Sequence, residues 1–586
     1  MKHKNRYLQL MGCFIYKNLH NVLLVFGGVI VFAFSIRHIA ELTSLLAWDE
    51  LGYWGNAAYI AGYDWADMVS TYSGYYSYGY SLILAVLLKI FSDSSVAYQA
   101  AIICNGIFLT LSFYLSYYCG ISCFGKKNRD KVLFASLVIS FYANSITQSN
   151  HAWTECFLIF LYWLLTALFI SLTRDYKFYK FLLIGLVSIY MYIVHTRTIG
   201  IVIASFLVLY ALCIFKRGTI WQCVVSVIFF ATVVIGVFYL QTELNTSVWN
   251  GKSDVELVNT VSYAAPWIFG KMSNIYGIID IIKAFLLRFF YFGMTTFLMF
   301  FVFLKKSVQD IICSIKSRQP KYHLVFLILS MLGIFGVMSL QLSQAGNYQS
   351  LLYGRYQDII VGPLFFMGIM YFLCEKEEKY QTLFHIIIWG SAMYLFCKIA
   401  RSIPIYTDYY VSNCNVELNR YWIGTWEGGY DLLFPISLAI IGCVIMAVIR
   451  YIYKDHKIYG VVALASIWLV FSVNEYYASE AVFEQEFTNY YDMEQFYSQA
   501  KDMCDEGEDI YYYNADYGLT TPLAMGLQME FYDRSIQIVE ETDSLKKGSY
   551  IFVPCIKENE YEFNPSADID GEILLSYKYL SLYKID

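Results

Sequence analysis

Two adjacent carboxylates, Asp49 and Glu50, directly follow the first long apolar segment of the chain. Carboxylates can accept a proton, stabilise a cation or bind a metal. Both lie within the loop of residues 41–95, which is rich in tyrosine and tryptophan, whose rings favour the membrane interface and also stack on the faces of sugars. Two plainer readings stay open: a solvated helix N-terminus for the acids and an interfacial belt for the rings. We interpret this loop as the candidate catalytic region.

The composition identifies an integral membrane protein. Of the 586 residues, 58% are hydrophobic and only 15% are charged, which is far more apolar than a soluble protein of this length requires. Apolar runs of membrane-spanning length recur as far as residue 475, and they do not alternate as the strands of a barrel would. The first run is too long for a signal-peptide core and has no small-residue cleavage site. We therefore expect a retained first span and a helical bundle.

The Lys and Arg clusters fall in alternate loops, as expected where basic residues mark cytoplasmic ends. This pattern predicts about thirteen spans in a multi-pass protein of the cell (cytoplasmic) membrane, with the N-terminus cytoplasmic and the C-terminus extracytoplasmic. The expected spans lie near residues 20–40, 96–121, 132–149, 154–172, 180–195, 199–215, 219–240, 281–304, 322–341, 352–374, 382–400, 432–450 and 458–475. Residues 80–91 are too short for a span, and we expect an interfacial or re-entrant helix there.

The charge distribution divides the chain into two domains. Residues 476–586 hold 23 acidic and 7 basic residues, a net charge of −16, whereas residues 1–475 have a net charge of +10. The second part has the pattern of a small extracytoplasmic α/β domain. We expect helices at 486–503 and 521–531 and strands at 509–513, 536–540, 550–554 and 573–583.

The ionisable residues of the membrane part gather near the outer ends of the expected spans. They are Arg37, His38, Glu41, Glu155, His195, Arg197, Arg288, Arg355, Asp358 and Lys398. A secondary transporter places such groups near the bilayer midplane, and ionisable residues within spans are costly unless they serve a function. The pattern favours an enzyme at the outer surface that uses a lipid-bound substrate with its phosphate at headgroup level.

Several motifs in order resemble the GT-C superfamily of membrane glycosyltransferases. After Asp49–Glu50 come the aromatic Gly-Tyr-Ser-Leu-Ile-Leu helix ending Leu88-Lys89-Ile90-Phe91, then Thr154-Glu155, His195-Thr196-Arg197-Thr198-Ile199-Gly200, and Tyr353-Gly354-Arg355-Tyr356 ahead of Pro363. The protein O-mannosyltransferase and aminoarabinose transferase branch is the most similar. The resemblance covers roughly residues 20–375. The prolines that relatives often carry before the helix at Tyr78 are missing here.

The resemblance implies transfer of a hexosyl or pentosyl group, with inversion, from a polyprenyl-phosphate carrier to a glycan, lipid or protein acceptor of the cell envelope. Asp49 matches the first acid of the family's loop motif and is the expected general base, while Glu50 would position the acceptor or join a metal site. Arg355, followed by Arg197 and Arg288, would bind the donor phosphate. The candidate substrate-lining residues are Glu155, His195, Tyr53, Trp54, Tyr78 and Tyr356.

The cofactor stays open, because some GT-C enzymes hold a divalent metal and others use none. Glu50, Asp64 and Asp67 are weak candidate ligands. The outer segments 241–276 and 401–431 could line the lipid or acceptor entrance or simply cover the bundle.

The main alternative function is a transporter or flippase of polyisoprenoid-linked glycans, whose grooves and outer arginines would look alike. A general base at Asp49 has no obvious place in such a protein. Basic residues are dispersed at span ends, so we expect no nucleic-acid partner.

Overall fold

The computed structural model describes residues 2–45, 47–74, 76–214, 219–249, 261–317, 319–342, 354–374, 379–401, 433–487, 493–514, 520–541, 545–558, 561–563 and 569–586. Parts of several sequence expectations lie outside these ranges. They include Tyr353 of the Tyr-Gly-Arg-Tyr motif, residues 250–260 of the first outer segment, residues 402–431 of the second, and residues 488–492 of the helix expected at 486–503.

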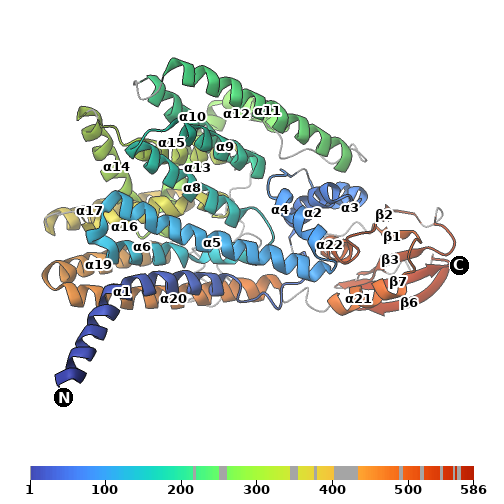
Figure 1. Ribbon diagram of the computed structural model, residues 1–586. Helices are drawn as coiled ribbons and strands as arrows, with labels where there is room; N and C mark the ends of the chain where they lie inside the picture. The colour runs from blue at the N-terminus through green and yellow to red at the C-terminus, as the bar shows by residue number, and fades with distance from the viewer. Residues whose placement is uncertain are drawn as a thin grey trace.

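The described residues up to Phe487 form a helical body whose long helices run side by side (Figure 1). Its helices up to residue 214 are α1 (Lys2–Ser35), α2 (Trp48–Ala61), α3 (Ala66–Tyr72), α4 (Ser81–Ile90), α5 (Ser94–Phe124), η1 (Lys126–Asn128), α6 (Arg129–Ser140), α7 (Ala143–Thr147), η2 (Gln148–Asn150), α8 (Glu155–Arg174), α9 (Phe178–Val194), η3 (Thr196–Thr198) and α10 (Ile199–Ile214). The remaining helices are α11 (Ile220–Val248), α12 (Val261–Met272), α13 (Ile275–Thr295), α14 (Met299–Lys316), α15 (Tyr322–Leu342), η5 (Asp358–Ile360), α16 (Val361–Cys374), α17 (Lys379–Arg401), α19 (Leu433–Asp455) and α20 (Lys457–Phe487).

The helical membrane architecture is confirmed, but the count of thirteen spans is not. Within the described ranges, eight helices are long and apolar enough to cross a membrane, or up to ten if each of two bent pairs forms one span. The other three expected spans coincide with shorter apolar helices, at Phe178–Val194, Asp358–Cys374 and Ile386–Phe396. The helix expected at residues 80–91 is α4, which also falls short of a span.

Two of the expected spans are broken. The segment near 132–149 bends by 56° between α6 and α7. The segment near 281–304 is bent more sharply, because α13 and α14 meet at 111°, as in a broken span or a re-entrant loop. Phe297 and Leu298 at this bend have φ of 51° and 62°, the left-handed conformation that ends a helix. Hydropathy alone misses both breaks, since the residues at them are themselves apolar.

The C-terminal domain is a small α/β unit, as predicted. It contains α21 (Glu494–Met503), β1 (Ile510–Tyr513), α22 (Thr520–Glu530), β2 (Ile536–Val539), β3 (Tyr550–Pro554), β4 (Ile556–Glu558), β5 (Tyr561–Phe563), β6 (Gly571–Tyr577) and β7 (Leu580–Ile585). Its five-stranded sheet has the order β2-β1-β3-β7-β6, with β1 parallel to both neighbours and β7 antiparallel to β3 and β6. The single strand expected at 573–583 is wrong: β6 and β7 form a hairpin, with Lys578 in its turn at a φ of 36°. The short β4–β5 pair was not predicted.

This domain lies at the same end of the helical body as α2, α3 and α4, whereas the N-terminal end of α1 is at the opposite end (Figure 1). Direct contacts join it to the candidate catalytic loop. The Trp65 indole donates to the Tyr532 carbonyl at 2.7 Å, and the Tyr72 hydroxyl donates to Asn514 Oδ1 at 2.9 Å. Helix α20 continues without interruption past residue 476, the predicted domain boundary, to Phe487. The C-terminal domain is therefore joined to the helical body by α20 and contacts the candidate catalytic loop through the Trp65 and Tyr72 hydrogen bonds.

Candidate active site

Helix α2 presents Asp49 at its first turn. Ala47, which precedes the helix, is extended, and its N–H donates to Glu50 Oε2 at 2.9 Å, closing that turn. Acidic residues at this position also favour the positive end of the helix dipole. The two adjacent carboxylates then diverge, because the Asp49 side chain is 25% exposed whereas the Glu50 side chain is fully buried.

Asp49 is held through both of its oxygens. The Tyr76 hydroxyl donates to Oδ1 at 2.5 Å, and Arg355 Nη2 lies 2.5 Å from Oδ2. Tyr76 is half-buried, and burial together with the Asp49 charge raises the pKa of its phenol well above the usual value. The phenol therefore remains a hydrogen-bond donor to Asp49 at physiological pH.

Glu155 contacts both Arg355 and Arg197, the first two arginines that were predicted from the sequence to bind the donor phosphate. It begins α8 and is almost completely buried, and its Oε1 lies 2.7 Å from Arg355 Nε and 3.0 Å from Arg197 Nη2. Arg197 lies in η3, the one-turn helix whose N-terminus is capped by His195 Nδ1. Because ion pairs between buried groups need several compensating contacts, this carboxylate with two guanidiniums is a specific arrangement.

Aromatic rings fix the position of Arg355. Its guanidinium carbon lies 3.5 Å from the centre of the Trp153 ring, and Tyr356 lies near both Arg355 and Arg197, at 5.8 Å and 5.2 Å. The preceding residue must be glycine, since a Cβ at Gly354 would come within 2.7 Å of three polar side-chain atoms. Asp49, Glu155, Arg197 and Arg355 together form a cluster, here called the charge cluster, in which two negative and two positive charges balance.

Glu50 has a different environment from Asp49. Its Oε1 accepts hydrogen bonds from the Tyr98 hydroxyl at 2.7 Å and from the Ala152 N–H at 2.6 Å, and its Oε2 accepts from Ala47. His151 Nδ1 lies 3.9 Å from Oε2. Glu50 thus connects α2, α5 and the segment before α8. These contacts position the elements that carry Asp49 and Glu155.

The other predicted lining residues divide into two groups. Tyr53 is next to the charge cluster: its hydroxyl is 3.4 Å from Thr154 Oγ1, its ring packs against Tyr76, and burial raises its pKa. Tyr78 lies in a different direction, with its hydroxyl donating to the Val237 carbonyl of α11 at 3.2 Å. Trp54 is buried and stacks on Tyr98.

Arg288 and the weak metal candidates lie apart from these contacts. Arg288 is buried on α13, and its Nη1 donates to Gln357 Oε1 at 3.1 Å. Asp64 accepts from Ala66 N–H within its own turn, and Asp67 Oδ2 is 3.4 Å from the Ile538 N–H of the C-terminal domain. Among the described residues, no group of three or more His, Cys, Asp or Glu side chains could hold a metal ion.

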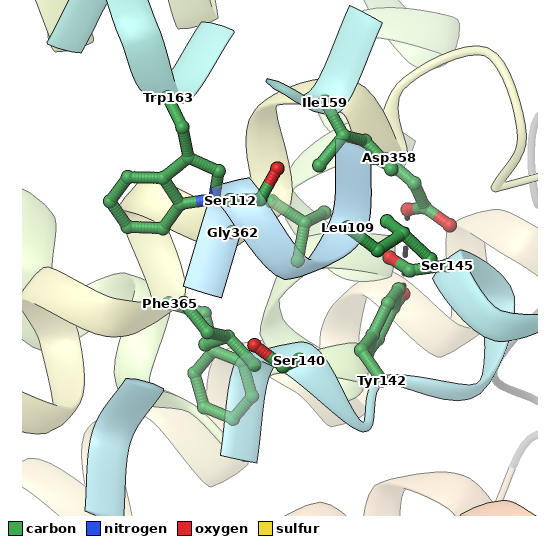
Figure 2. A pocket seen from close by; sticks show the side chains of 12 residues that line it. Leu109, Ser112, Ser140, Tyr142, Ser145, Ile159, Trp163, Asp358, Gly362 and Phe365 are labelled. Carbon is green, nitrogen blue, oxygen red and sulfur yellow. Dashed lines mark hydrogen bonds between the residues drawn. The ribbon is translucent and has the colours of Figure 1, made fainter. Parts of the chain in front are cut away.

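A further buried carboxylate, Asp358, supports the Arg355 turn. It accepts from Asn144 Nδ2 at 2.6 Å, from the Tyr291 hydroxyl at 2.8 Å and from the Tyr142 hydroxyl at 3.4 Å. Figure 2 shows Asp358 and Tyr142 beside a cavity whose wall also includes Ser112, Ser140, Ser145 and Trp163. Its volume of about 20 Å³ accommodates roughly one water molecule and no sugar.

The segment between α6 and α8 is therefore held by acids from three other elements. Glu475 of α20 accepts from the Ala143 N–H at 2.6 Å, Asp358 of η5 holds the Asn144 side chain, and Glu50 of α2 holds the Ala152 N–H. Sequence reasoning noted Asp358 but assigned it no role, and it missed Glu475, Tyr76 and Trp153 as site residues. Tyr76 was one ring among many in its loop, and no local pattern distinguishes it.

Comparison with solved structures identifies the fold. The chain is similar to ArnT from Cupriavidus metallidurans bound to undecaprenyl phosphate, with a TM-score of 0.54 and 12% identity over 97% of this chain and 98% of that chain. Apo ArnT from the same organism gives a TM-score of 0.52 and 11% identity over 96% and 97%. The chain has the GT-C fold. An Archaeoglobus fulgidus oligosaccharyltransferase tethered with an acceptor peptide gives 0.42 and 12% identity, covering 89% and 64%. No protein-family model and no curated protein matches the chain.

The predicted GT-C fold is thus confirmed, and the similarity extends beyond the expected residues 20–375. It spans nearly the whole of both chains, so the C-terminal domain is part of the matched architecture. Within this GT-C fold, the charge cluster lies where the candidate catalytic loop meets the starts of α8 and η3 and the turn at Arg355.

Proposed function

We propose that the protein is an inverting membrane glycosyltransferase that uses a polyprenyl-phosphate sugar at the outer face of the cytoplasmic membrane. The observation that carries this proposal is the charge cluster: a partly exposed carboxylate lies in contact with a guanidinium, and a second guanidinium shares the same buried acid. A proton acceptor and a phosphate-binding cation side by side are the two groups that this reaction requires. ArnT, which shares the fold, was crystallised with undecaprenyl phosphate, and this supports a donor of that class.

The reaction follows from the roles of these groups. The acceptor hydroxyl or amine attacks the anomeric carbon of the sugar from the side opposite the phosphate. The bond from that carbon to the phosphate oxygen breaks, and the electron pair leaves with polyprenyl phosphate. Asp49 takes the proton of the attacking group, and Arg355 and Arg197 stabilise the charge on the leaving phosphate. Displacement from the opposite side inverts the anomeric centre.

The proposed sidedness rests on the sequence and on the arrangement of the domains. Basic clusters place the loop with Asp49 outside, and the C-terminal domain contacts that loop through Trp65 and Tyr72. Both would then face the extracytoplasmic space, where this domain can bind or orient the acceptor. The residues described do not fit a metal site, so no step is assigned to a metal.

The test is release of free polyprenyl phosphate from a panel of polyprenyl-phosphate sugars by purified protein in detergent. Asp49→Asn should lower turnover by about two to four powers of ten, as loss of a general base does. The matched control is Asp93→Asn, because Asp93 caps α5 and asparagine caps equally well. Equal turnover by wild type and Asp49→Asn would remove Asp49 as the base. If wild type releases no carrier with any donor and acceptor, a transporter or flippase of lipid-linked glycans becomes the better explanation.

A further inference from the structure

We propose that Asp49 and the donor phosphate compete for Arg355, and that Tyr76 is the positioning residue that holds Asp49 after the phosphate has replaced it at the arginine. This inference rests on the proposed function and adds an order to it: the base becomes available only when the donor is bound.

The first support is the geometry of Asp49. Oδ2 faces Arg355 Nη2 at 2.5 Å and Oδ1 faces the Tyr76 hydroxyl at 2.5 Å. Both oxygens are therefore directed at protein donors and not at an incoming acceptor. Each contact occupies one acceptor site of the carboxylate, so the loss of either leaves Asp49 more open to the acceptor proton, and the guanidinium is the contact with a competing anion to bind.

The second support is the way Arg355 is anchored. Its Nε contacts Glu155, which is 1% exposed, and its plane lies over Trp153. Its Nη2 contacts Asp49, the most exposed member of the charge cluster. Water weakens the exposed ion pair more than the buried one. Arg355 can thus keep its Nε bond to Glu155 while a phosphate oxygen replaces Asp49 Oδ2 beside Nη2.

The net charge of the charge cluster and the unused N–H groups of Arg197 also support an exchange at Arg355. The cluster carries no net charge before a donor arrives, so it attracts a phosphate more strongly once the ion pair between Arg355 and Asp49 opens. Arg197 has capacity left, because its buried Nε and Nη1 find no hydrogen-bond acceptor among the residues that the structure describes. A phosphate that draws Nη2 of Arg355 away would leave Asp49 with a free oxygen beside the donor sugar.

Tyr76 would keep that carboxylate from swinging away. The phenol donates to the oxygen that Arg355 does not hold, so this contact survives the exchange. The ring itself is confined, since a Cβ on Gly52 would lie 2.1 Å from it. Tyr76 thereby aims the second oxygen of Asp49 at the acceptor.

The test is a double-mutant cycle on the affinity for undecaprenyl phosphate, measured at equilibrium in detergent with Asp49→Asn, Arg355→Gln and the double variant. Removing the competitor should make Asp49→Asn bind about tenfold more tightly than wild type, although it is inactive in transfer. In the Arg355→Gln background the same substitution should have no effect. Asp93→Asn removes one outer negative charge without touching Arg355 and should bind as wild type does.

Each outcome decides between the hypotheses. Equal tightening in both Arg355 backgrounds, or tightening by Asp93→Asn as well, would indicate general charge repulsion and overturn the exchange. Tight binding by wild type that Asp49→Asn does not improve would also overturn it, while the proposed function stands. No binding by any protein would overturn the proposed function, and the exchange with it. If Arg355→Gln does not fold, the comparison of Asp49→Asn with Asp93→Asn still decides.

The role of Tyr76 has its own readout. Tyr76→Phe should lower kcat about tenfold or more while leaving the affinity for undecaprenyl phosphate within twofold, because it acts after donor binding. The matched control is Tyr162→Phe, which removes a buried phenol bonded to Ser330 at 2.7 Å, away from the charge cluster. A fall in affinity that matches the fall in kcat, or an equal effect of Tyr162→Phe, would overturn the positioning role.

Discussion

Glu155 and Arg355, which are 200 residues apart in the chain, are joined by a contact of 2.7 Å between Oε1 and Nε. This pair connects the start of α8 to the turn before η5, and Asp49 of α2 meets the same guanidinium from the other side. Three distant parts of the sequence therefore converge on one arginine.

Arg355→Lys should test whether activity depends on the simultaneous contacts of Arg355 with Asp49 and Glu155. A lysine has one nitrogen and cannot contact Glu155 and Asp49 through separate, fixed N–H groups as Arg355 does. We expect kcat/KM for the donor to fall about 100-fold, although the positive charge is kept. Steady-state kinetics with varied donor measures the effect. Arg129→Lys, at a partly exposed arginine on the predicted cytoplasmic side, is the control and should be silent. Unchanged kinetics of Arg355→Lys would show that charge alone suffices.

Gly52→Ala should displace the Tyr76 ring, which packs directly against Gly52. The new Cβ would lie 2.1 Å from the Tyr76 ring, so the ring and its hydrogen bond to Asp49 must shift. We expect about a tenfold or greater loss of turnover. Gly55→Ala, one helical turn later, is the matched control, because its Cβ would instead press on Val69 of α3 at 2.4 Å. Loss of turnover by both variants to the same extent would mean that α2 packing in general, and not Tyr76, is responsible.

Glu50→Gln should lower the thermal stability of the protein. The buried carboxylate accepts hydrogen bonds from Tyr98, Ala152 and Ala47, and an amide in its place must direct an N–H group at some of these donors. We expect the apparent Tm in detergent to fall by about 2–5 °C. Tyr98→Phe removes one of the three donors and should cause a smaller fall. An unchanged Tm together with lost activity would point instead to direct contact between Glu50 and a substrate.

Asp505 gives a pH-dependent prediction for the C-terminal domain. Hydrogen bonds from Tyr550 and Lys584, at 2.7 Å and 3.2 Å, lower the pKa of Asp505 below its ordinary value of 3.8. A lowered folded-state pKa means that the contribution to stability is complete above that ordinary value and is lost as the pH falls through the lower folded-state pKa. Asp505→Asn should thus lower Tm slightly at pH 7, less in high salt, and not at all below the folded-state pKa. Differential scanning fluorimetry across pH checks this, and a deficit that persists at low pH would contradict it.

The sequence predicted the elements well where a single local signal decides them. Strands β1, β2 and β3 fall within one residue of the expected ranges, because β-branched and aromatic runs between turn residues are strong signals. The α13–α14 bend escaped prediction, since Phe297 and Leu298 are apolar residues in a left-handed conformation that is imposed by packing. The hairpin at Lys578 escaped for the same reason: no glycine or asparagine marks its turn.

Part of the candidate site could be predicted from the sequence. The acids and arginines of the charge cluster could be proposed because ionisable groups at span ends are conspicuous in an apolar sequence. Their pairing could not: the sequence ranked Arg355 ahead of Arg197 and Arg288, but only the fold shows that the first two contact Glu155. Tyr76 and Glu475 were missed because their roles depend entirely on contacts with distant segments.

The bond between Glu475 and the Ala143 N–H has a consequence for biogenesis. Glu475 lies on α20, the last helix of the membrane part to emerge during synthesis, while the segment that it secures leads directly into Glu155. A nascent chain that has inserted every earlier helix still lacks this attachment. The protein would then mature only after α20 has been synthesised, and a premature stop before α20 would leave an inserted product without this attachment for membrane quality control to remove.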